Sequence, residues 1–401
     1  MERALNTGRS ATSGRPPFRV TRQLHVLAPL AAALALIPIA VSIRHTADFG
    51  LAYQGGVEAW ASGHPERVST WFSTPFLAFV MAVISRLTTE VVGAHLFLAL
   101  NVLLWGGLLV AVWSQLHGRV PSLWWWGTLV AAAVFSPGIS TIFWLNFNLI
   151  VFVLALGGFV LIGRHDRLAG LLIGASLASK PILLLLPLAL LMRRESRSAG
   201  VWALVVAAVF SAGGLAFLAW RAGDWTVLDP VPYLADFADK TRRPFVTCVI
   251  QNYSQQAFLC RLGVPPSTAL TVGLAAAIGG IGYWLTRRFR DSPATAWELF
   301  AAACLLSPML GPIEWATYQL LFAPLMLLLA YQFWAEGAPR RLWVFLVVTF
   351  LMTDVVWDPL ETLARTPLPV LVVSYLTGQF AQYVLLLTWA RWLSLRKASP
   401  A

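Results

Sequence analysis

The sequence is poor in charged residues. Only 12% of its 401 residues are Asp, Glu, Lys or Arg, whereas 58% are hydrophobic. A soluble domain cannot hide that much apolar surface in its core, so this composition excludes an ordinary soluble protein. Apolar runs of roughly 17 to 25 residues, the length needed to cross a bilayer, recur along nearly the whole chain. The sequence therefore predicts an all-α polytopic membrane protein.

Lysine is also scarce, and it occurs only at Lys180, Lys240 and Lys397. The net charge of +11 comes mainly from arginines in short loops and tails. The basic positions in these clusters are Arg15, Arg19, Arg22, Arg193, Arg194, Arg197, Arg287, Arg288, Arg290, Arg340, Arg341, Arg391, Arg396 and Lys397. This is the positive-inside pattern of membrane proteins, not the basic face of a nucleic-acid-binding protein. It predicts that both chain ends and these loops lie in the cytoplasm and that nucleic acid is not a partner.

Cysteine is nearly absent, with three residues in the chain. No Cys/His cluster has the spacing of a zinc site, and the sequence contains no pattern of an obligate metal site. Cys304 lies in an apolar run and is expected to be an inert core residue. Cys248 and Cys260 share one outward loop, where a disulfide is permitted. Two cysteines in one loop leave open whether they pair.

About twelve apolar runs are long enough to be counted as spans. They lie near residues 24–43, 72–87, 91–113, 122–137, 141–163, 168–192, 200–220, 266–286, 295–311, 315–335, 341–357 and 369–393. We expect residues 1–23 to form a cytoplasmic basic tail, 24–395 one transmembrane domain, and 396–401 a second cytoplasmic tail. Alternation of the spans places two larger outward loops at 44–71 and 221–265. The first run is read as a retained span, not as a cleaved signal peptide, because the rest of the bundle follows it directly.

This alternation conflicts with the charge rule at one place. The motif Arg164-His-Asp-Arg167 would lie on the outer side, although short basic loops favour the cytoplasm. Chain breakers at Ser136-Pro137-Gly138 and at Lys180-Pro181 offer a resolution, since proline interrupts helical backbone. We therefore expect short or re-entrant helices within 122–163 or 168–192.

Two charged residues are candidates for chemistry. Asp48 opens the outward loop 44–71, where a carboxylate can act as a base between a polar acceptor and a membrane-bound donor. The same residue suits the N-cap of an interfacial helix. Lys180 lies inside an apolar run, where a cation is costly and is usually paired or functional. It would bind an anionic lipid phosphate, unless its long side chain extends to the interface beside the kink.

Four more polar residues lie at interruptions of the apolar runs. Asn146 and Asn148 stand at the start of a span, where they would hydrogen-bond a sugar or a phosphate, or join neighbouring helices. Glu314 and Tyr318 follow two prolines that interrupt a span. Irregular backbone at membrane depth is tolerated only when it is buried in protein or lines a cavity, so both are cavity candidates.

The loop 221–265 carries a further polar group. Asn252, Ser254 and Arg261 lead into the next span, and Arg261 can form a two-pronged contact with a phosphate or fix the depth of a helix. The same loop interleaves aromatic and charged residues, which suits carbohydrate binding or an interfacial aromatic belt.

Taken in order, these segments resemble the polyprenyl-phosphate-sugar-dependent glycosyltransferases of the C-type superfamily. The most similar group is the actinobacterial family that holds α-1,2-mannosyltransferases and arabinofuranosyltransferase C. The resemblance covers most of the chain after residue 44 and depends on an ordered set of motifs. The set comprises Asp48 with Tyr53, Asn148, the run Ala169-Gly-Leu-Leu-Ile-Gly174 ending in Lys180, Asn252 with Ser254 and Arg261, and Leu306-Ser307-Pro308 with Tyr318.

The motifs differ between the two branches of that family. Asp48-Phe49 with Tyr53, and Lys180-Pro181, are similar to the arabinofuranosyl branch. The mannosyl branch commonly has Gly-Gln before the asparagine and a Pro-Pro pair after the first loop, where this chain has Asn146-Phe147 and Thr74-Pro75. The sugar is therefore open between mannose and arabinofuranose.

The resemblance implies a C-type bundle with its active site on the outer face of a bacterial plasma membrane. It makes Asp48 the catalytic base and assigns the donor phosphate to Lys180, Arg261, Asn252 and Ser254. It assigns substrate contacts to Tyr53, Asn146, Asn148, Glu314 and Tyr318. The donor would be a polyprenyl-phosphate sugar and the acceptor a lipoglycan or glycolipid. A single displacement would invert the anomeric centre without a cofactor.

Two other classes compete with this interpretation. A transporter or flippase of a lipid-linked sugar would also use Lys180 inside the membrane and broken spans. The lack of a repeat between the two halves, and the place of Asp48 in a loop, argue against it. A non-catalytic relative that has lost activity is suggested by departures around Trp315, and the presence of Asp48 argues against that class.

Overall fold

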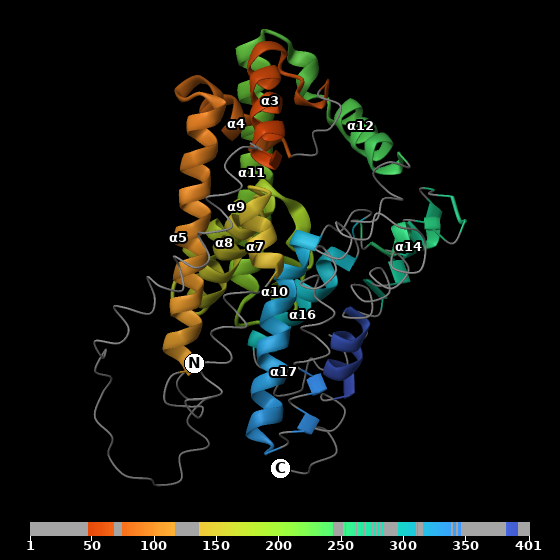
Figure 1. Cartoon of the computed structure of the whole chain (residues 1–401). Helices are drawn as coiled ribbons and strands as arrows, with labels where there is room; N and C mark the ends of the chain where they lie inside the picture. The colour runs from red at the N-terminus through yellow and green to blue at the C-terminus, as the bar shows by residue number, and fades with distance from the viewer. Residues whose placement is uncertain are drawn as a thin grey trace, which may run out of the picture.

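The computed structural model describes residues 47–67, 74–116, 136–243, 296–309, 316–337 and 382–391, together with parts of 252–283 and 311–345. These residues form helices and contain no extended strand, which confirms the all-α class (Figure 1). The predicted spans 24–43 and most of 122–137, 341–357 and 369–393 lie outside the described residues. The described residues do not confirm the count of twelve spans.

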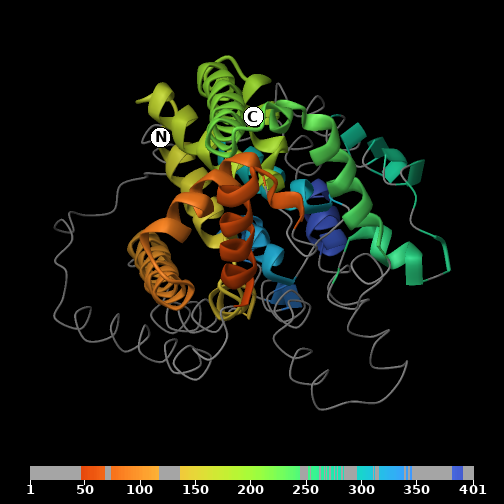
Figure 2. The same ribbon diagram turned by 90° about the horizontal axis from the view of Figure 1, so that it is seen from above.

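Two helices in the described part of the chain are long and apolar enough to cross a bilayer. They are α5 (Glu90–Leu116), through its segment Glu90–Leu108, and α11 (Arg197–Ala222). Only 28% and 17% of their most apolar windows are buried inside the molecule. The core helix of a soluble protein would be mostly buried, whereas these helices expose valine, leucine and tryptophan side chains along their length. Figures 1 and 2 show α5 (orange) at one edge of the molecule.

The predicted span 168–192 is broken into three pieces. Helix α9 (Asp166–Ser179) ends where the backbone of Lys180 becomes extended, and Pro181 opens the short 3-10 helix η2 (Pro181–Leu183). Helix α10 (Leu185–Leu191) follows after one more residue. Proline lacks the N–H that would continue α9, so the break at Lys180-Pro181 that the sequence indicates is confirmed.

Helix α9 runs parallel to α11. A Cβ on Gly170 would lie 3.0 Å from the carbonyl oxygen of Ala199, and a Cβ on Gly174 would lie 2.6 Å from the carbonyl oxygen of Ala203. Residue numbers therefore increase in the same direction along both helices. The guanidinium of Arg167 lies over the ring of Trp202, near the start of α11. Only glycine permits this close approach of the two backbones. Helix α10 then returns toward the start of α11, because Gly200 contacts Pro187 and Leu191.

These contacts correct the expected topology. The basic segments 164–167 and 193–197 lie at the same end of α11, which we call the basic end, and not at opposite ends as the alternation of spans requires. The segment α9–η2–α10 enters from the basic end and returns to it, with Lys180 at its tip. The conflict between span alternation and charge at Arg164 is thereby removed, because both arginine-rich segments are on one side.

The predicted span 72–87 is also corrected. Helix α4 (Pro75–Leu87) has 13 residues, so it is about 20 Å long and cannot cross a hydrocarbon core of about 30 Å. The ring of Phe76 on α4 stacks on Phe210, and the ring of Phe79 packs edge-on against Phe217. Phe210 and Phe217 are both on the C-terminal half of α11. Helix α4 packs against α3 (Ala47–Ser62), a helix that occupies most of the predicted loop 44–71. Both short helices therefore lie beside the far half of α11.

The other apolar runs are divided in a similar way. The run 141–163 consists of the end of α7 (Ser136–Phe143), a turn, and α8 (Asn148–Leu161), which packs antiparallel to α9. The run 295–311 forms α16 (Ala296–Met309). The run 315–335 divides into the 3-10 helix η4 (Ala316–Phe322) and α17 (Ala323–Ala335). The loop 221–265 contains η3 (Trp225–Leu228), α12 (Pro230–Arg242) and α14 (Gln255–Arg261).

Candidate active site

Three chain breaks meet at one point of the fold. They are the start of α3, the turn between α7 and α8, and the junction of α9 with η2. The backbone N–H of Asp48 donates to the carbonyl oxygen of Trp144 at 3.0 Å, which joins the first two. The tip of the segment α9–η2–α10 brings in the third. Helix ends leave backbone groups and side chains unpaired by the helix itself, so polar side chains gather here.

The carboxylate of Asp48 is held by a side chain from the turn. Its Oδ2 atom accepts a hydrogen bond from Nδ2 of Asn146 at 2.5 Å, across 98 residues of sequence. Asp48 is in the first turn of α3, yet its carboxylate has no partner within that helix in the described part of the chain, so a capping role does not account for it. Burial raises the pKa of Asp48 above its ordinary value of 3.8, against the opposing effects of the Lys180 charge and the Asn146 hydrogen bond. A raised pKa makes the carboxylate a better proton acceptor.

The turn before α8 is strained. Leu145 has a φ of 52°, the left-handed region that a residue with a branched side chain rarely adopts. Its side chain is nevertheless buried among Phe49 and Phe97. Such a conformation is unfavourable by about 1–3 kcal/mol and persists only where the surroundings impose it. Here it orients Asn146 toward Asp48 on one side and toward Lys180 on the other.

Lys180 is surrounded by neutral groups. Its Nζ atom donates to Oδ1 of Asn148 at 2.8 Å and to Oδ1 of Asn146 at 3.3 Å, and it lies 4.6 Å from the centre of the Tyr318 ring. Within the described ranges, no carboxylate is within ion-pair distance of Lys180. Asn146 thus stands between the carboxylate and the ammonium group and binds both. The arrangement keeps a base and a cation side by side without direct neutralisation.

The structure brings together five of the predicted site residues, namely Asp48, Asn146, Asn148, Lys180 and Tyr318. We call them, with Thr317, the Asp48–Lys180 cluster. Thr317 was missed by the sequence reasoning, although it directly precedes Tyr318, and its Oγ1 accepts from Nδ2 of Asn148 at 3.0 Å.

Thr74 was missed as well. It caps α4 by accepting from the N–H of Leu77, and its hydroxyl donates to the carbonyl oxygen of Ser179 beside Lys180 at 3.1 Å. The Thr-Pro pair that opens α4 is the signal that identifies this cap.

Other predicted residues lie elsewhere or outside the described set. The hydroxyl of Tyr53 donates to the carbonyl oxygen of Thr88 at 2.8 Å, so it ties α3 to the end of α4. Asn252 and Ser254 are buried in a turn where the N–H of Ser254 donates to Oδ1 of Asn252, next to Gln255 and Gln382. Arg261 is the last residue of α14, but its side chain and all of Glu314 lie outside the described residues.

Two further predictions concern cysteines and metals. Cys260 is disulfide-bonded, Cys304 is a free buried thiol, and the predicted partner Cys248 lies outside the described residues. Among the residues that the structure describes, no three His, Cys, Asp or Glu side chains are placed to hold a metal ion.

A buried base and a cation that are separated by one amide side chain are typical of enzymes in which a nucleophile is deprotonated while a phosphate leaves. Sugar transferases belong to this class of enzymes. The comparison with known families leads to the same class. Residues 71–312, more than half of the chain, match the model of glycosyltransferase family 87, and the chain belongs to this family. The protein is therefore a glycosyltransferase, consistent with the C-type resemblance. No curated protein and no solved structure matches the chain.

The range that matches the family model covers some of the predicted site residues and not others. It includes Asn146, Asn148, Lys180, Asn252, Ser254 and Arg261, whereas Asp48, Tyr53, Glu314 and Tyr318 lie outside it. The family match thus supports the enzyme class but assigns no role to Asp48. The argument for that residue depends on its place in the Asp48–Lys180 cluster.

Proposed function

We propose that the protein is an inverting membrane glycosyltransferase that moves mannose or arabinofuranose from a polyprenyl-phosphate donor to a lipoglycan or glycolipid acceptor. Asp48 is the base and Lys180 binds the donor phosphate. The observation that carries the proposal is the shared amide of Asn146, which hydrogen-bonds the carboxylate of Asp48 through Nδ2 and the ammonium of Lys180 through Oδ1.

The reaction follows from the two ends of this cluster. Oδ1 of Asp48, which has no hydrogen-bond partner within the described chain, accepts the proton of an acceptor hydroxyl. The hydroxyl oxygen forms a bond to the anomeric carbon as the bond from that carbon to the phosphate oxygen breaks. The electron pair leaves with the polyprenyl phosphate, and the nearby Lys180 stabilises its charge. One displacement of this kind inverts the anomeric centre.

A lipid donor also fits the position of Lys180. The tip of the segment α9–η2–α10 is part-way along α11, because Thr74 binds the carbonyl oxygen of Ser179 while Pro75 contacts Gly214 on α11. A cation at that depth is stable only with polar partners or an anionic ligand, and a lipid phosphate can reach it from within the bilayer. The charge rule assigns the basic end to the cytoplasm. The opposite end, toward which α3 and α4 lie, would then face outward from the plasma membrane.

The test is a transfer assay on purified full-length protein in detergent. Polyprenyl-phosphate mannose and polyprenyl-phosphate arabinofuranose are offered separately with a mixed lipoglycan acceptor. We expect transfer from one donor by the wild type and a loss on the order of 10² to 10⁴ in Asp48→Asn. Asp166→Asn is the matched control, because among the described residues this carboxylate binds the N–H of Gly163, at the end of α9 opposite to Lys180. It should transfer at the wild-type rate.

Each outcome of this assay has a definite meaning. Loss in Asp48→Asn alone supports the base assignment, and the donor that is consumed identifies the sugar. Normal turnover in Asp48→Asn would falsify the mechanism. Transfer from neither donor by folded wild-type protein would overturn the donor assignment, and movement of the lipid-linked sugar across vesicles would then favour the transporter class.

A further inference from the structure

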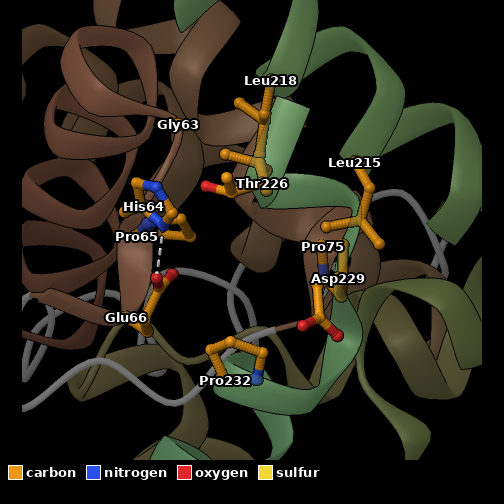
Figure 3. A pocket seen from close by; sticks show the side chains of 11 residues that line it. Gly63, His64, Pro65, Glu66, Pro75, Leu215, Leu218, Thr226, Asp229 and Pro232 are labelled. Atoms are coloured by element: carbon orange, nitrogen blue, oxygen red, sulfur yellow. Dashed lines mark hydrogen bonds and ion pairs between the residues drawn. The ribbon is translucent and has the colours of Figure 1, made fainter. Parts of the chain in front are cut away.

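The far end of α3 holds a second polar region, distinct from the Asp48–Lys180 cluster. Here η1 (Pro65–Arg67), which follows α3, meets η3 and α12 from the loop 221–265. Helix α3 has 16 residues, and at 1.5 Å per residue this region lies about 24 Å along the helix from Asp48. Figure 3 shows the hollow that opens between these elements.

The walls of the hollow are fastened by ionic contacts. Nδ1 of His64 lies 2.7 Å from the carboxylate of Glu66, and its Nε2 lies 3.2 Å from that of Asp224. Lys240 of α12 is 1% exposed, and its Nζ binds the carbonyl oxygen of Glu66 at 2.5 Å and the carboxylate of Asp236 at 2.7 Å. A buried lysine with two partners fixes α12 against η1. The hollow is therefore built by tertiary contacts and is not a gap between loose loops.

Two carboxylate oxygens at the hollow have no donor among the described residues, and Asp229 is exposed there. Glu66 uses Oε1 for His64, and Asp229 uses Oδ1 to cap α12 through the N–H of Val231. In the described part of the chain, Oε2 of Glu66 and Oδ2 of Asp229 have no hydrogen-bond partner. Figure 3 shows Glu66 and Asp229 on two sides of the hollow, which Pro232 and Leu215 also line. The site therefore offers hydrogen-bond acceptors beside apolar surface.

The ligand that this combination suits is a neutral sugar. Its hydroxyl groups donate to carboxylates, while the C–H face of its ring packs on proline and leucine. An anion is disfavoured, because Glu66 and Asp229 line the hollow and none of its described lining residues is Lys or Arg. Hydrogen bonds from the side chain and N–H of Thr226, and then from His64, lower the pKa of Asp224 to about 2, so this carboxylate stays charged at working pH.

We propose that the hollow between Glu66 and Asp229 binds a sugar unit of the acceptor, remote from the unit that is glycosylated. This inference rests on the proposed function. A contact about 24 Å from the base requires an acceptor of several linked sugars. The enzyme would therefore extend or branch an existing glycan, and single sugars would be poor acceptors because they cannot occupy both sites at once.

The test compares long and short acceptors with Glu66→Gln and Asp229→Asn. Glutamine can still accept from His64, and asparagine still caps α12, so both variants should fold. We expect the KM for a long oligosaccharide acceptor to rise about tenfold, because one charge-assisted hydrogen bond is weakened. The KM for a monosaccharide glycoside and for the donor should not change. Asp239→Asn is the matched control, since Asp239 is on α12 but pairs with Arg243 outside the hollow.

Direct binding separates this inference from the transfer mechanism. Calorimetric titration of wild type and variants with the oligosaccharide alone should give weaker binding only in Glu66→Gln and Asp229→Asn. Binding of this kind without any transfer would keep the sugar site and overturn the proposed function. Equal changes for long and short acceptors, or no change for either, would overturn the sugar site. It would also be overturned if EDTA abolished binding and Ca²⁺ restored it, since the carboxylates would then hold a cation.

Discussion

At the scale of single residues, Asn146 connects the two charged groups of the Asp48–Lys180 cluster and keeps them apart. Its amide presents Nδ2 to Asp48 and Oδ1 to Lys180, so it satisfies both without protonating one or neutralising the other. A direct ion pair would make the carboxylate a weaker base and would occupy the cation that we propose for the donor phosphate. These contacts support a positioning role for Asn146, and the substrate contact that the resemblance assigned to it stays a prediction.

The first residue-scale prediction concerns Asn146 and its neighbour. Asn146→Ala should let Lys180 pair directly with Asp48, which lowers kcat by about 10²-fold and moves the acidic limb of the pH profile to lower pH. Asn148→Ala removes the 2.8 Å contact to Lys180 and the 3.0 Å contact to Thr317 but leaves Asn146 between Asp48 and Lys180. It should raise the KM for the donor and leave the acidic limb in place. The same shift of the limb in both variants would contradict the positioning role.

The second residue-scale prediction concerns the acidic limb of the pH profile of activity. With Asp48 as the proposed base, catalysis needs its unprotonated carboxylate, so activity should fall as the pH drops through the pKa of this group. Because burial raises that pKa, the half-activity point of kcat/KM should lie above pH 3.8. The measurement is the transfer rate across a buffer series, with Asp166→Asn as a control that keeps the limb. A midpoint at or below 3.8 excludes Asp48 as the titrating base.

At the scale of the helices, glycines decide how closely the backbones approach. A Cβ on Gly214 of α11 would lie 2.8 Å from the carbonyl oxygen and 3.1 Å from the carbonyl carbon of Pro75. These are backbone atoms at the start of α4 and cannot rotate away. The neighbouring Gly213 has nothing within 4 Å. Two adjacent positions on one helix therefore face different surroundings.

This difference predicts opposite effects of the same substitution. Gly214→Ala should destabilise the protein by about 1–3 kcal/mol, because overpacking displaces α4 and with it Thr74. Gly213→Ala should be neutral or stabilise by up to about 1 kcal/mol, because alanine favours a helix. Thermal unfolding in one detergent, with transfer activity measured beside it, compares the pair. Equal losses in both variants would mean that α11 tolerates no side chain here for another reason.

At the scale of the whole molecule, the arginine-rich segments share one end. The segment α9–η2–α10 turns back at Lys180, so residues 164–167 and 193–197 both lie near the start of α11. The two predicted outward loops meet through His64 with Asp224 and Lys240 with Glu66. Segments that contact each other must lie on the same side of a membrane, as the alternation of spans predicts for these two loops.

Single cysteines test this arrangement in intact cells. Arg167→Cys and Arg194→Cys should both resist a thiol reagent that does not cross the membrane and react only after permeabilisation. Asp239→Cys on α12 should react without permeabilisation. The wild type gives the background, because Cys304 is buried and Cys260 is disulfide-bonded. Labelling of Arg167→Cys from outside, with Arg194→Cys protected, would restore a single continuous span over 168–192.

Composition and local pattern determined much of this protein from the sequence alone. The apolar runs predict helices, and the structure confirms them where it describes the chain. The break at Lys180-Pro181 is also local, because proline removes a backbone donor wherever it stands. Lys180 was singled out because a cation within an apolar run is costly unless it is paired or used, and Asp48 because a carboxylate in the outward loop can act as a base there.

Only the tertiary structure decided which way the chain runs and which side chains meet. The length of an apolar run does not show whether the run crosses the membrane. Helices α4 and α9 pack on α11 through Gly214 of α11 and through Gly170 and Gly174 of α9, and no sequence periodicity reveals these contacts. Asn146 and Thr317 reach their partners across long stretches of sequence. Tyr53 was assigned to the site by its spacing from Asp48, yet it binds the end of α4. Spacing along a helix sets a direction, whereas the packing of other helices decides what lies there.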